Sequence, residues 1–131
     1  MFALDTNTVA YFFKGMGKVA ENMLQRAPDE IALPAIVLYE LEVGVAKTRQ
    51  AERRRRQLDE LLASITVFEF GPAEARVTAR LRAELEMSGA PIGPLDTLIA
   101  GTVLSRGATL VTRNLREFGR VPGLHVVDWF G

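Results

Sequence analysis

Short apolar runs that alternate with longer amphipathic segments limit the fold of this 131-residue chain more than any other feature. Four of these runs have the length of buried strands and cover residues 1–4, 31–33, 109–112 and 125–127. A fifth run, residues 66–70, alternates apolar and polar side chains and is predicted as a strand or extended segment. Because strands that alternate with helices form parallel sheets, the pattern predicts one α/β domain over residues 1–131 with a mainly parallel central sheet.

The segments between these runs have helical periodicity. Val37, Leu41 and Val45, for example, recur at the spacing of one helix face. Residues 91–94 form a proline-rich connector, after which Asp96 is expected to open a helix that ends at Gly107. The remaining helices are predicted over residues 6–15, 17–26, 36–47, 50–64, 72–88 and, as a single turn, 114–118.

Composition excludes several classes of protein. The absence of cysteine removes disulfides, thiolate metal sites and cysteine nucleophiles. No stretch of about 18 apolar residues occurs and the N-terminus has no basic region before an apolar run, so we expect a cytoplasmic protein with no membrane partner. Sixteen basic and sixteen acidic side chains cancel, which argues against unspecific coating of nucleic acid but permits a local basic patch.

Three acidic side chains are candidates for a functional site. Asp5 ends the first strand, at the edge where parallel sheets bind ligands, and Asp96 begins an apolar helix. Glu40 lies beside the apolar face of the helix over residues 36–47. Each has a simpler interpretation, since Asp5 and Asp96 could cap helices and Glu40 could be solvated.

The combination of these acids favours a metal site. Carboxylates gathered at one edge repel each other unless a cation neutralises them, and hard divalent cations prefer oxygen ligands. Because the chain has no cysteine and one histidine, Mg²⁺ or Mn²⁺ is favoured over zinc. Such an ion would suit hydrolysis of phosphodiester bonds.

The sequence resembles the PIN-domain ribonuclease toxins of the VapC family, which belong to VapBC toxin–antitoxin pairs. The resemblance spans nearly the whole chain. It is carried, in order, by Leu4-Asp-Thr-Asn7, Tyr39-Glu-Leu41 with Gly44, Arg82-Ala-Glu-Leu85 before Gly89, Pro91-Ile-Gly-Pro-Leu-Asp96 with Ile99-Ala-Gly101, Val111-Thr-Arg-Asn114 with Glu117-Phe118, Val121-Pro-Gly-Leu124 and Asp128-Trp129.

This resemblance implies a three-layer α/β/α sandwich, a homodimer, and Mg²⁺- or Mn²⁺-dependent cleavage of RNA, often in tRNA anticodon stem-loops, that inhibits translation. It also implies a cognate VapB-type antitoxin whose tail blocks the site. Asp5, Glu40 and Asp96 match the first three acids of the family. Many members have aspartate where this chain has Asn114, which we expect to be catalytic along with the three acids. Glu117, one helical turn later, is the candidate for the missing carboxylate ligand of the metal.

Arginines supply the candidates for RNA binding. Arg113 and Arg116 follow the late strand, beside the expected site, and are predicted to contact phosphate. The run Arg53–Arg56 could steer RNA, but a charged helix face is more often simply solvated. His125 is expected to be structural, and one of the aromatic residues at positions 11–13 is expected to line an interface.

An aspartate at the end of the first strand also occurs in classes of protein other than PIN ribonucleases. A haloacid-dehalogenase-like phosphatase would need a second aspartate where this chain has Asn7, and a receiver domain would need a late lysine, whereas the last lysine is Lys47. An inactive PIN-like protein-binding domain and a PIN nuclease of RNA maturation remain open. RNA cleavage separates the first from an enzyme, and the neighbouring gene separates the second from a toxin.

Overall fold

The computed structural model describes all residues from Met1 to Gly131 and contains one five-stranded sheet. All neighbouring strands pair in parallel, in the order β3-β2-β1-β4-β5. The predicted parallel α/β class is therefore confirmed. The strands are short: β1 (Phe2–Leu4), β2 (Ile31–Pro34), β3 (Thr66–Phe68), β4 (Thr109–Val111) and β5 (His125–Val127).

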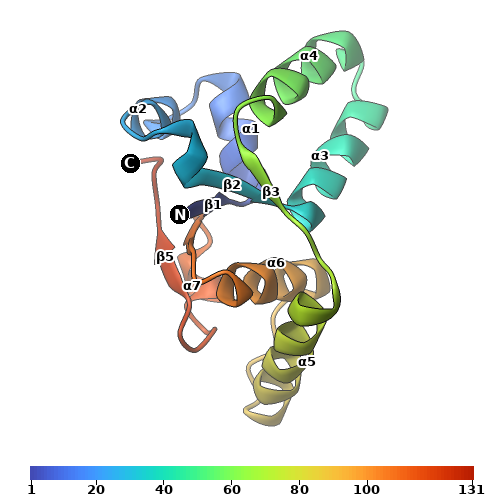
Figure 1. Cartoon of the computed structure of the whole chain (residues 1–131), viewed down its shortest axis with the longest axis vertical. Coiled ribbons are helices and arrows are strands. Elements are labelled where there is room, and N and C mark those ends of the chain that lie inside the picture. Colours follow the sequence, from blue (N-terminus) through green and yellow to red (C-terminus); the bar gives the residue numbers. More distant parts are fainter.

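Helices cover both faces of this sheet. Figure 1 shows α1 to α4 on one side and α5 to α7 on the other, with both chain termini at the same lateral edge. No helix combines the length and apolarity that crossing a membrane requires. The helices are α1 (Thr6–Lys14), α2 (Val19–Leu24), the 3₁₀ turn η1 (Pro28–Glu30), α3 (Ala35–Lys47), α4 (Ala51–Leu62), α5 (Pro72–Met87), α6 (Pro94–Ser105) and α7 (Leu115–Phe118).

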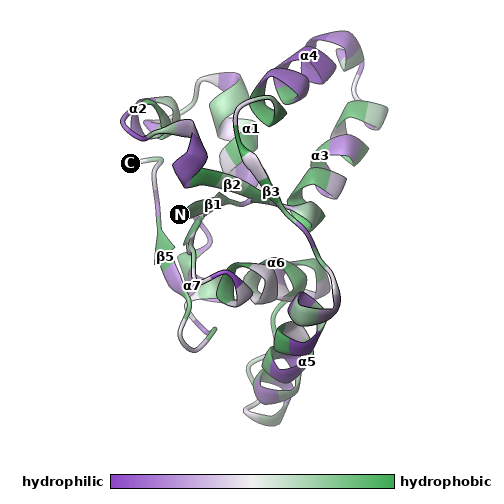
Figure 2. Cartoon of the chain, viewed as in Figure 1, coloured by the Kyte–Doolittle hydropathy of each residue, from purple (hydrophilic) through white to green (hydrophobic).

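The hydrophobic core lies on the two faces of the central strands. Leu4, Leu33 and Leu110, one from each of β1, β2 and β4, have no exposed surface. Figure 2 shows β2 as hydrophobic, whereas α4 is hydrophilic over most of its length. Strands buried on both faces read as unbroken apolar runs, which is why the sequence revealed them.

The strand order places a topological switch at β1, whose two neighbours are β2 and β4. The chain runs from β1 to β2 on one side and later crosses from β3 to β4 on the other side of β1. At such a point a crevice for ligands forms beyond the carboxyl ends of the strands. The two central strands are tied together at that edge, because the Asp5 amide donates to the Val111 carbonyl at 3.1 Å. Residues that follow β1 and β4 therefore share one rim of the molecule.

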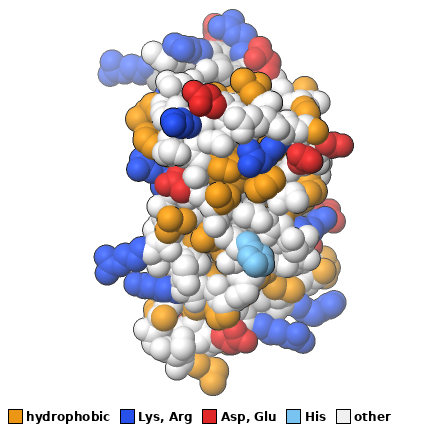
Figure 3. All heavy atoms as spheres, turned by 90° about the vertical axis from the view of Figure 1, so that its left-hand side faces the viewer, with side chains coloured by type: hydrophobic (Ala, Val, Ile, Leu, Met, Phe, Trp, Pro, Cys, Tyr) orange, Lys and Arg blue, Asp and Glu red, His pale blue; other side chains and the backbone are white.

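The strand β5 forms the edge of the sheet next to β4. Its first residue, His125, is exposed on the face that Figure 3 presents, away from the acidic candidates. The interpretation of His125 as a strand residue is confirmed. The same face shows Lys and Arg side chains spread over its height and interspersed with Asp and Glu.

Several predicted boundaries shift. The helix predicted from Asp96 begins at Pro94, with Gly93 as its N-cap, because proline suits the first helical position. Asp96 therefore lies inside the first turn, and its interpretation as a helix cap is wrong. Pro34 is the last residue of β2 rather than its end signal, while α2 is shorter than residues 17–26 and β3 ends at Phe68 instead of residue 70.

Helix α5 buries a different stripe from the one predicted. Helical spacing in the sequence predicts Val77, Leu81 and Leu85 as the inner face of this helix, but Val77 is only half-buried and the buried stripe continues through the polar residues Thr78 and Glu74. Glu74 is stabilised because it accepts a hydrogen bond from the Gly71 amide at 2.9 Å. Hydrophobic periodicity could not show this, because the helix packs through polar side chains at its N-terminal half.

Candidate active site

Asp5 occupies the rim directly after β1 and is only 7 % exposed. Its Oδ1 atom accepts a hydrogen bond from the Thr8 amide at 2.8 Å, so Asp5 is the N-cap of α1. The cap interpretation is therefore confirmed, but it uses one carboxylate oxygen only. The other oxygen makes no hydrogen bond within the chain and leaves Asp5 able to act as a ligand as well.

Glu40 reaches the same rim from the second turn of α3. It is half-buried, and its Oε1 atom accepts a hydrogen bond from the Thr6 hydroxyl at 2.7 Å. Thr6 follows Asp5 directly, so this bond ties α3 to the carboxyl end of β1. The interpretation of Glu40 as a freely solvated helix residue is wrong, because its side chain is turned inward and held.

Asp96 and Glu117 meet beside Gly93. The Gly93 amide donates to Glu117 Oε1 at 2.7 Å. A Cβ atom placed on Gly93 would lie 3.5 Å from Glu117 Oε1 and 3.6 Å from Asp96 Oδ2, so the two carboxylates flank this glycine. The α6 N-terminus and α7 are thereby brought together, and Glu117 joins the acidic candidates as the sequence proposed.

The pKa of Asp96 responds to the charges of the three other acids. Burial, then the charge of Glu117 and a hydrogen bond with it, then the charges of Glu40 and Asp5 raise the pKa of Asp96 to about 6. The pKa of Glu117 is lowered instead, chiefly by the hydrogen bond from the Gly93 amide and then by one from Asn114. A buried acid whose pKa is raised by neighbouring carboxylates indicates negative charge that the site does not compensate.

Asn114 has a local role in the structure. It is the N-cap of α7, where its Oδ1 accepts from the Glu117 amide at 3.4 Å, and its Nδ2 donates to Glu117 Oε2 at 2.9 Å. Its own amide donates to the Thr112 hydroxyl at 3.0 Å. The side chain is exposed and acts on the acidic group through Glu117. Asn114 is therefore a helix cap, and Glu117 is held by hydrogen bonds from Gly93 and Asn114 rather than freely solvated.

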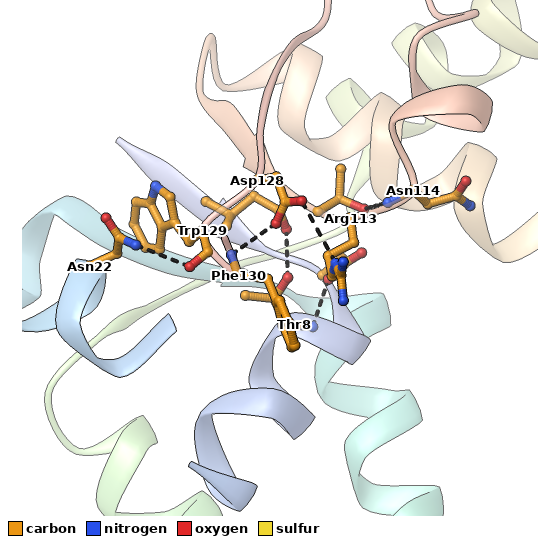
Figure 4. A network of polar contacts seen from close by, with 10 residues as sticks. Thr8, Asn22, Arg113, Asn114, Asp128, Trp129 and Phe130 are labelled. Atoms are coloured by element: carbon orange, nitrogen blue, oxygen red, sulfur yellow. Dashed lines mark hydrogen bonds and ion pairs between the residues drawn. The ribbon is translucent and has the colours of Figure 1, made fainter. Parts of the chain in front are cut away.

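Arg113 contributes to a polar network that holds the C-terminal segment. Its Nε lies 3.7 Å from Asp128 Oδ2, and its guanidinium group stands 3.8 Å from the centre of the Phe130 ring. Figure 4 shows Arg113 directed toward Asp128 and Phe130, while Asn114 points away from them. Arg113 is still 47 % exposed, and Arg116 is exposed and forms no ion pair, so phosphate contact by both remains a prediction.

The donor set suits a hard divalent cation in kind, because Asp5, Glu40, Asp96 and Glu117 offer carboxylate oxygens only. The pKa of Asp96 is raised, as expected where several carboxylates gather and no positive charge neutralises them. In the observed side-chain conformations, no three His, Cys, Asp or Glu side chains converge closely enough to hold an ion. Binding would therefore require side-chain rotation at the rim.

Two residues of the rim were not singled out from the sequence. Thr6 orients Glu40, and Gly93 donates to Glu117 where any side chain would meet both carboxylates. Both lie within the short motifs Leu4-Asp-Thr-Asn7 and Pro91-Ile-Gly-Pro94, so the motifs contained the signal. The type of residue alone did not, because threonine in a first helical turn and glycine before a helix are common.

A parallel α/β sheet with carboxylates at its switch point is the arrangement expected of a PIN-like nuclease, and comparison with known proteins identifies the family. The PIN domain family matches residues 2–124. The tRNA(fMet)-specific endonuclease VapC of Salmonella typhimurium is 35 % identical over 128 residues, 98 % of this chain and 97 % of the relative. Ribonuclease VapC2 of Rickettsia felis is 34 % identical over 137 residues, 98 % of both chains.

The solved structure of VapBC2 from Rickettsia felis, bound to a DNA fragment from its promoter, superposes with a TM-score of 0.90 at 35 % identity, covering 98 % of both chains. The chain belongs to the VapC ribonucleases of the PIN-domain family. Ribonucleases of this family generally depend on a divalent metal. The resemblance seen in the sequence motifs is confirmed, as is the class of endoribonuclease.

Proposed function

We propose that this protein is a Mg²⁺-dependent endoribonuclease toxin that hydrolyses phosphodiester bonds of tRNA, with Mn²⁺ as an alternative ion. The observation that carries the proposal is that four acids from separate elements lie at one rim, near enough for three of them to raise the pKa of the fourth: Asp5 after β1, Glu40 on α3, Glu117 on α7 and, as the fourth, Asp96 on α6. Repulsion between these negative charges destabilises the metal-free protein, and a bound cation would relieve that repulsion.

A bound hard cation would supply water activation and would stabilise the charge that develops on the phosphate. The chain itself contributes geometry and charge. Asp5, Glu40, Asp96 and Glu117 are assigned as the anionic ligands, and Asp5 keeps one carboxylate oxygen that accepts no hydrogen bond within the chain. Glu40 is oriented by Thr6, and Glu117 by Gly93 and Asn114.

Arg113 and Arg116 are proposed to bind the substrate backbone beside this rim. Both follow the late strand directly, and their charges are opposite to those of phosphate. Arg116 is free of intramolecular ion pairs, while Arg113 could exchange its loose contact with Asp128 for phosphate. We assign tRNA as the substrate because a relative at 35 % identity is named as a tRNA endonuclease, and we place this activity in the cytoplasm, where tRNA is used.

A VapB-type antitoxin is the proposed partner, since the structures most like this one include VapBC complexes. We propose that it inserts a basic side chain, most simply arginine, among the carboxylates. A guanidinium group pairs bidentately with carboxylate and can replace the cation there. The free toxin is proposed to be a homodimer, as the family resemblance implies.

The test is cleavage of a bacterial tRNA pool by the chelated protein, with and without added Mg²⁺ or Mn²⁺. We expect activity only with metal, with Asp96→Asn abolishing it and Asp29→Asn, an exposed aspartate far from the rim, retaining it. Sequencing of the cut ends then identifies the tRNA and the position. Undiminished cleavage after thorough chelation would refute the metal site, and absence of cleavage under every condition would favour a protein-binding PIN-like domain.

A further inference from the structure

A groove leads away from the acidic rim between α1, α3 and α4. It encloses about 390 Å³, and Glu40 stands at one end of it while Thr48 and Arg54 stand at the other. Lys14, exposed in the last turn of α1, lies on its wall. Eight residues of helix separate Glu40 from Thr48, so the groove extends roughly 12 Å from the rim along α3. Its far end joins the start of α4, where the arginines gather.

The arginines of this region divide into two groups in the structure. Arg55 is neutralised, because it pairs with Glu42 and lies 3.4 Å from Asp59. Arg54 donates to Gln57 at 2.7 Å and stands over the Phe13 ring. These two residues are half-buried and serve the packing of α4 against α1 and α3.

The second group faces solvent at the end of the groove. Arg49, Arg53 and Arg56 are exposed and form no ion pair within the chain. Arg53 and Arg56 are three residues apart on α4, which places them on one side of the helix. They line a surface hollow together with Arg49. The sequence run of arginines thus contains a compact set of unpaired positive charges.

Gly44 adds an observation that does not depend on charge. It lies in the middle of α3 and lines the groove, and a Cβ atom placed on it would have no neighbour within 4 Å. Glycine is among the poorest helix formers, and no packing contact in the chain requires it here. Its absence of a side chain instead keeps the groove open between Glu40 and the arginines.

We propose that this groove carries a single-stranded part of the RNA substrate from Glu40 past Gly44 to Arg49, Arg53 and Arg56, whose guanidinium groups pair with its phosphates. The inference rests on the proposed ribonuclease function and adds an extended site that binds the backbone of the RNA substrate. Half of the residues that line the groove are apolar, and the unpaired cations gather in the adjoining hollow, where Arg49 follows Thr48 and Arg53 precedes Arg54 in the chain. This concentration of positive charge favours nucleic acid over a protein segment.

The first test removes the charges. Arg49→Gln, Arg53→Gln and Arg56→Gln are combined in the full-length Asp96→Asn protein, so that RNA is bound but not cut. Binding of random-sequence RNA pools of 5 and 16 nucleotides is measured by fluorescence anisotropy over a range of salt concentrations. The matched control combines Arg76→Gln, Arg80→Gln and Arg82→Gln, three exposed arginines on α5.

We expect the longer pool to bind the Asp96→Asn parent more tightly than the shorter pool, and the triple variant to lose this advantage. Each single-strand phosphate contact contributes about 0.7 to the slope of log affinity against log salt, so losing three lowers the slope by about 2. The α5 control should keep both the slope and the length advantage. An equal loss in both triple variants would show a general charge effect and overturn the proposal.

The second test blocks the groove without changing charge. Gly44→Leu fills the open space and should weaken binding of the 16-nucleotide pool by at least about tenfold, on the scale of a lost base or backbone contact. Ala46→Leu, on the exposed side of the same helix, should not. Unchanged RNA binding with lost partner binding in Gly44→Leu would assign the groove to a protein and refute our proposal.

These outcomes are separable from failure of the proposed function itself. If the unmodified protein cleaves RNA with metal but both groove variants bind like their controls, only the backbone site is wrong. If the unmodified protein cleaves no RNA, the ribonuclease function fails before the groove is tested. Thermal melting of each variant at one pH confirms that the protein is folded before binding is compared.

Discussion

Asp96 and Glu117 flank the same backbone amide, that of Gly93, yet their carboxyl groups respond to it in opposite ways. Glu117 accepts the amide hydrogen at 2.7 Å, which holds the pKa of Glu117 below its usual range. Asp96 receives no such bond, and burial together with the neighbouring negative charges raises its pKa to about 6. Glu117 therefore stays ionised to a lower pH than an ordinary glutamate. The protonation of Asp96 should change most when a cation binds at the rim.

The first prediction concerns the pH dependence of stability in metal-free protein. The folded state keeps a proton on Asp96 up to about pH 6, whereas the unfolded chain releases it near 3.8. Between these values the folded state binds more protons, so this group's contribution to the free energy of unfolding falls as pH rises, and the loss is complete above pH 6. The chelated protein should therefore melt lower at pH 7.5 than at pH 5.

Asp96→Asn removes the repulsion and should flatten this change. After allowance for the half-exposed position of Asp96, we expect the variant to exceed the parent by about 1 kcal/mol in metal-free unfolding at pH 7.5. Urea unfolding at the two pH values measures it, with Asp29→Asn as control. The lowered pKa of Glu117 acts below about pH 4.5 and does not disturb this window. An unaltered pH slope in Asp96→Asn would contradict the assignment.

The second prediction concerns Thr6 as a positioning residue. Thr6→Val keeps the shape of the side chain but removes the hydroxyl that donates to Glu40 at 2.7 Å. Residues that orient ligands typically change metal affinity or activity by 10–100-fold, so we expect about a tenfold rise in the Mg²⁺ midpoint for cleavage. Thr6→Ser should restore the parental midpoint.

The exposed Thr66, which forms no hydrogen bond through its side chain, supplies the control variant Thr66→Val. A structural role for Thr6 alone would lower the melting temperature without moving the Mg²⁺ midpoint. If Thr6→Val and Thr66→Val titrate identically with Mg²⁺, the orienting role is refuted.

The fold was predictable because its signals are local. Strands buried on both faces appear as short apolar runs, and proline and glycine mark most helix ends. The parallel order followed from the alternation of strands with helices. What the sequence could not show was the first turn of α6, where Pro94 moves the start two residues ahead of Asp96. An aspartate at the cap and one in the first turn look alike in sequence, since both favour a helix N-terminus.

The acidic residues of the candidate site were predictable from the motifs, but their relations were not. The bond from Thr6 to Glu40 spans 34 positions, and that from Gly93 to Glu117 spans 24. Such contacts depend on how α3 and α7 pack on the sheet, which no local pattern encodes. The division of the arginine run into paired and unpaired members has the same cause, because Glu42, the partner of Arg55, belongs to another helix.

The third prediction concerns the close approach of α5 and α6. A Cβ atom on Gly101 would lie 1.9 Å from Thr78 Oγ1 and 2.8 Å from Thr78 Cα. Gly101→Ala should therefore destabilise the fold by about 3 kcal/mol, the upper range for overpacking. Urea unfolding measures this loss, and Gly44→Ala, a helix glycine with open space around it, should be neutral or stabilising.

Removing the Thr78 hydroxyl tests the origin of this strain. Thr78 Oγ1 is buried and has no hydrogen-bond partner, so Thr78→Ala should cost little on its own. Combined with Gly101→Ala it should recover only part of the loss, because the Thr78 backbone is also too close. Complete recovery in the double variant would show that the helices can separate freely, contrary to our reading of the contact.

The last prediction compares Glu117 with Asn114. Glu117→Gln keeps an oxygen that can accept from Gly93 but removes a negative charge, and that charge is the first cause after burial of the raised pKa of Asp96. Asn114→Ala leaves every carboxylate in place but removes the cap of α7 and the bond to Glu117 Oε2. We therefore expect Glu117→Gln to raise the Mg²⁺ midpoint more, and Asn114→Ala to cost about 1 kcal/mol of stability, as lost caps do.

Titration of Mg²⁺ against cleavage rate, alongside urea unfolding, separates the two effects, with the exposed Glu84→Gln as the control. Asn114→Asp sharpens the comparison, because aspartate keeps the cap acceptor but replaces the amide donor with a second charge beside Glu117. In metal-free protein this charge should raise the pKa of Asp96 further and increase the stabilisation that Mg²⁺ gives. Parental midpoints in both Glu117→Gln and Asn114→Asp would leave Asp5, Glu40 and Asp96 as the complete set of ligands.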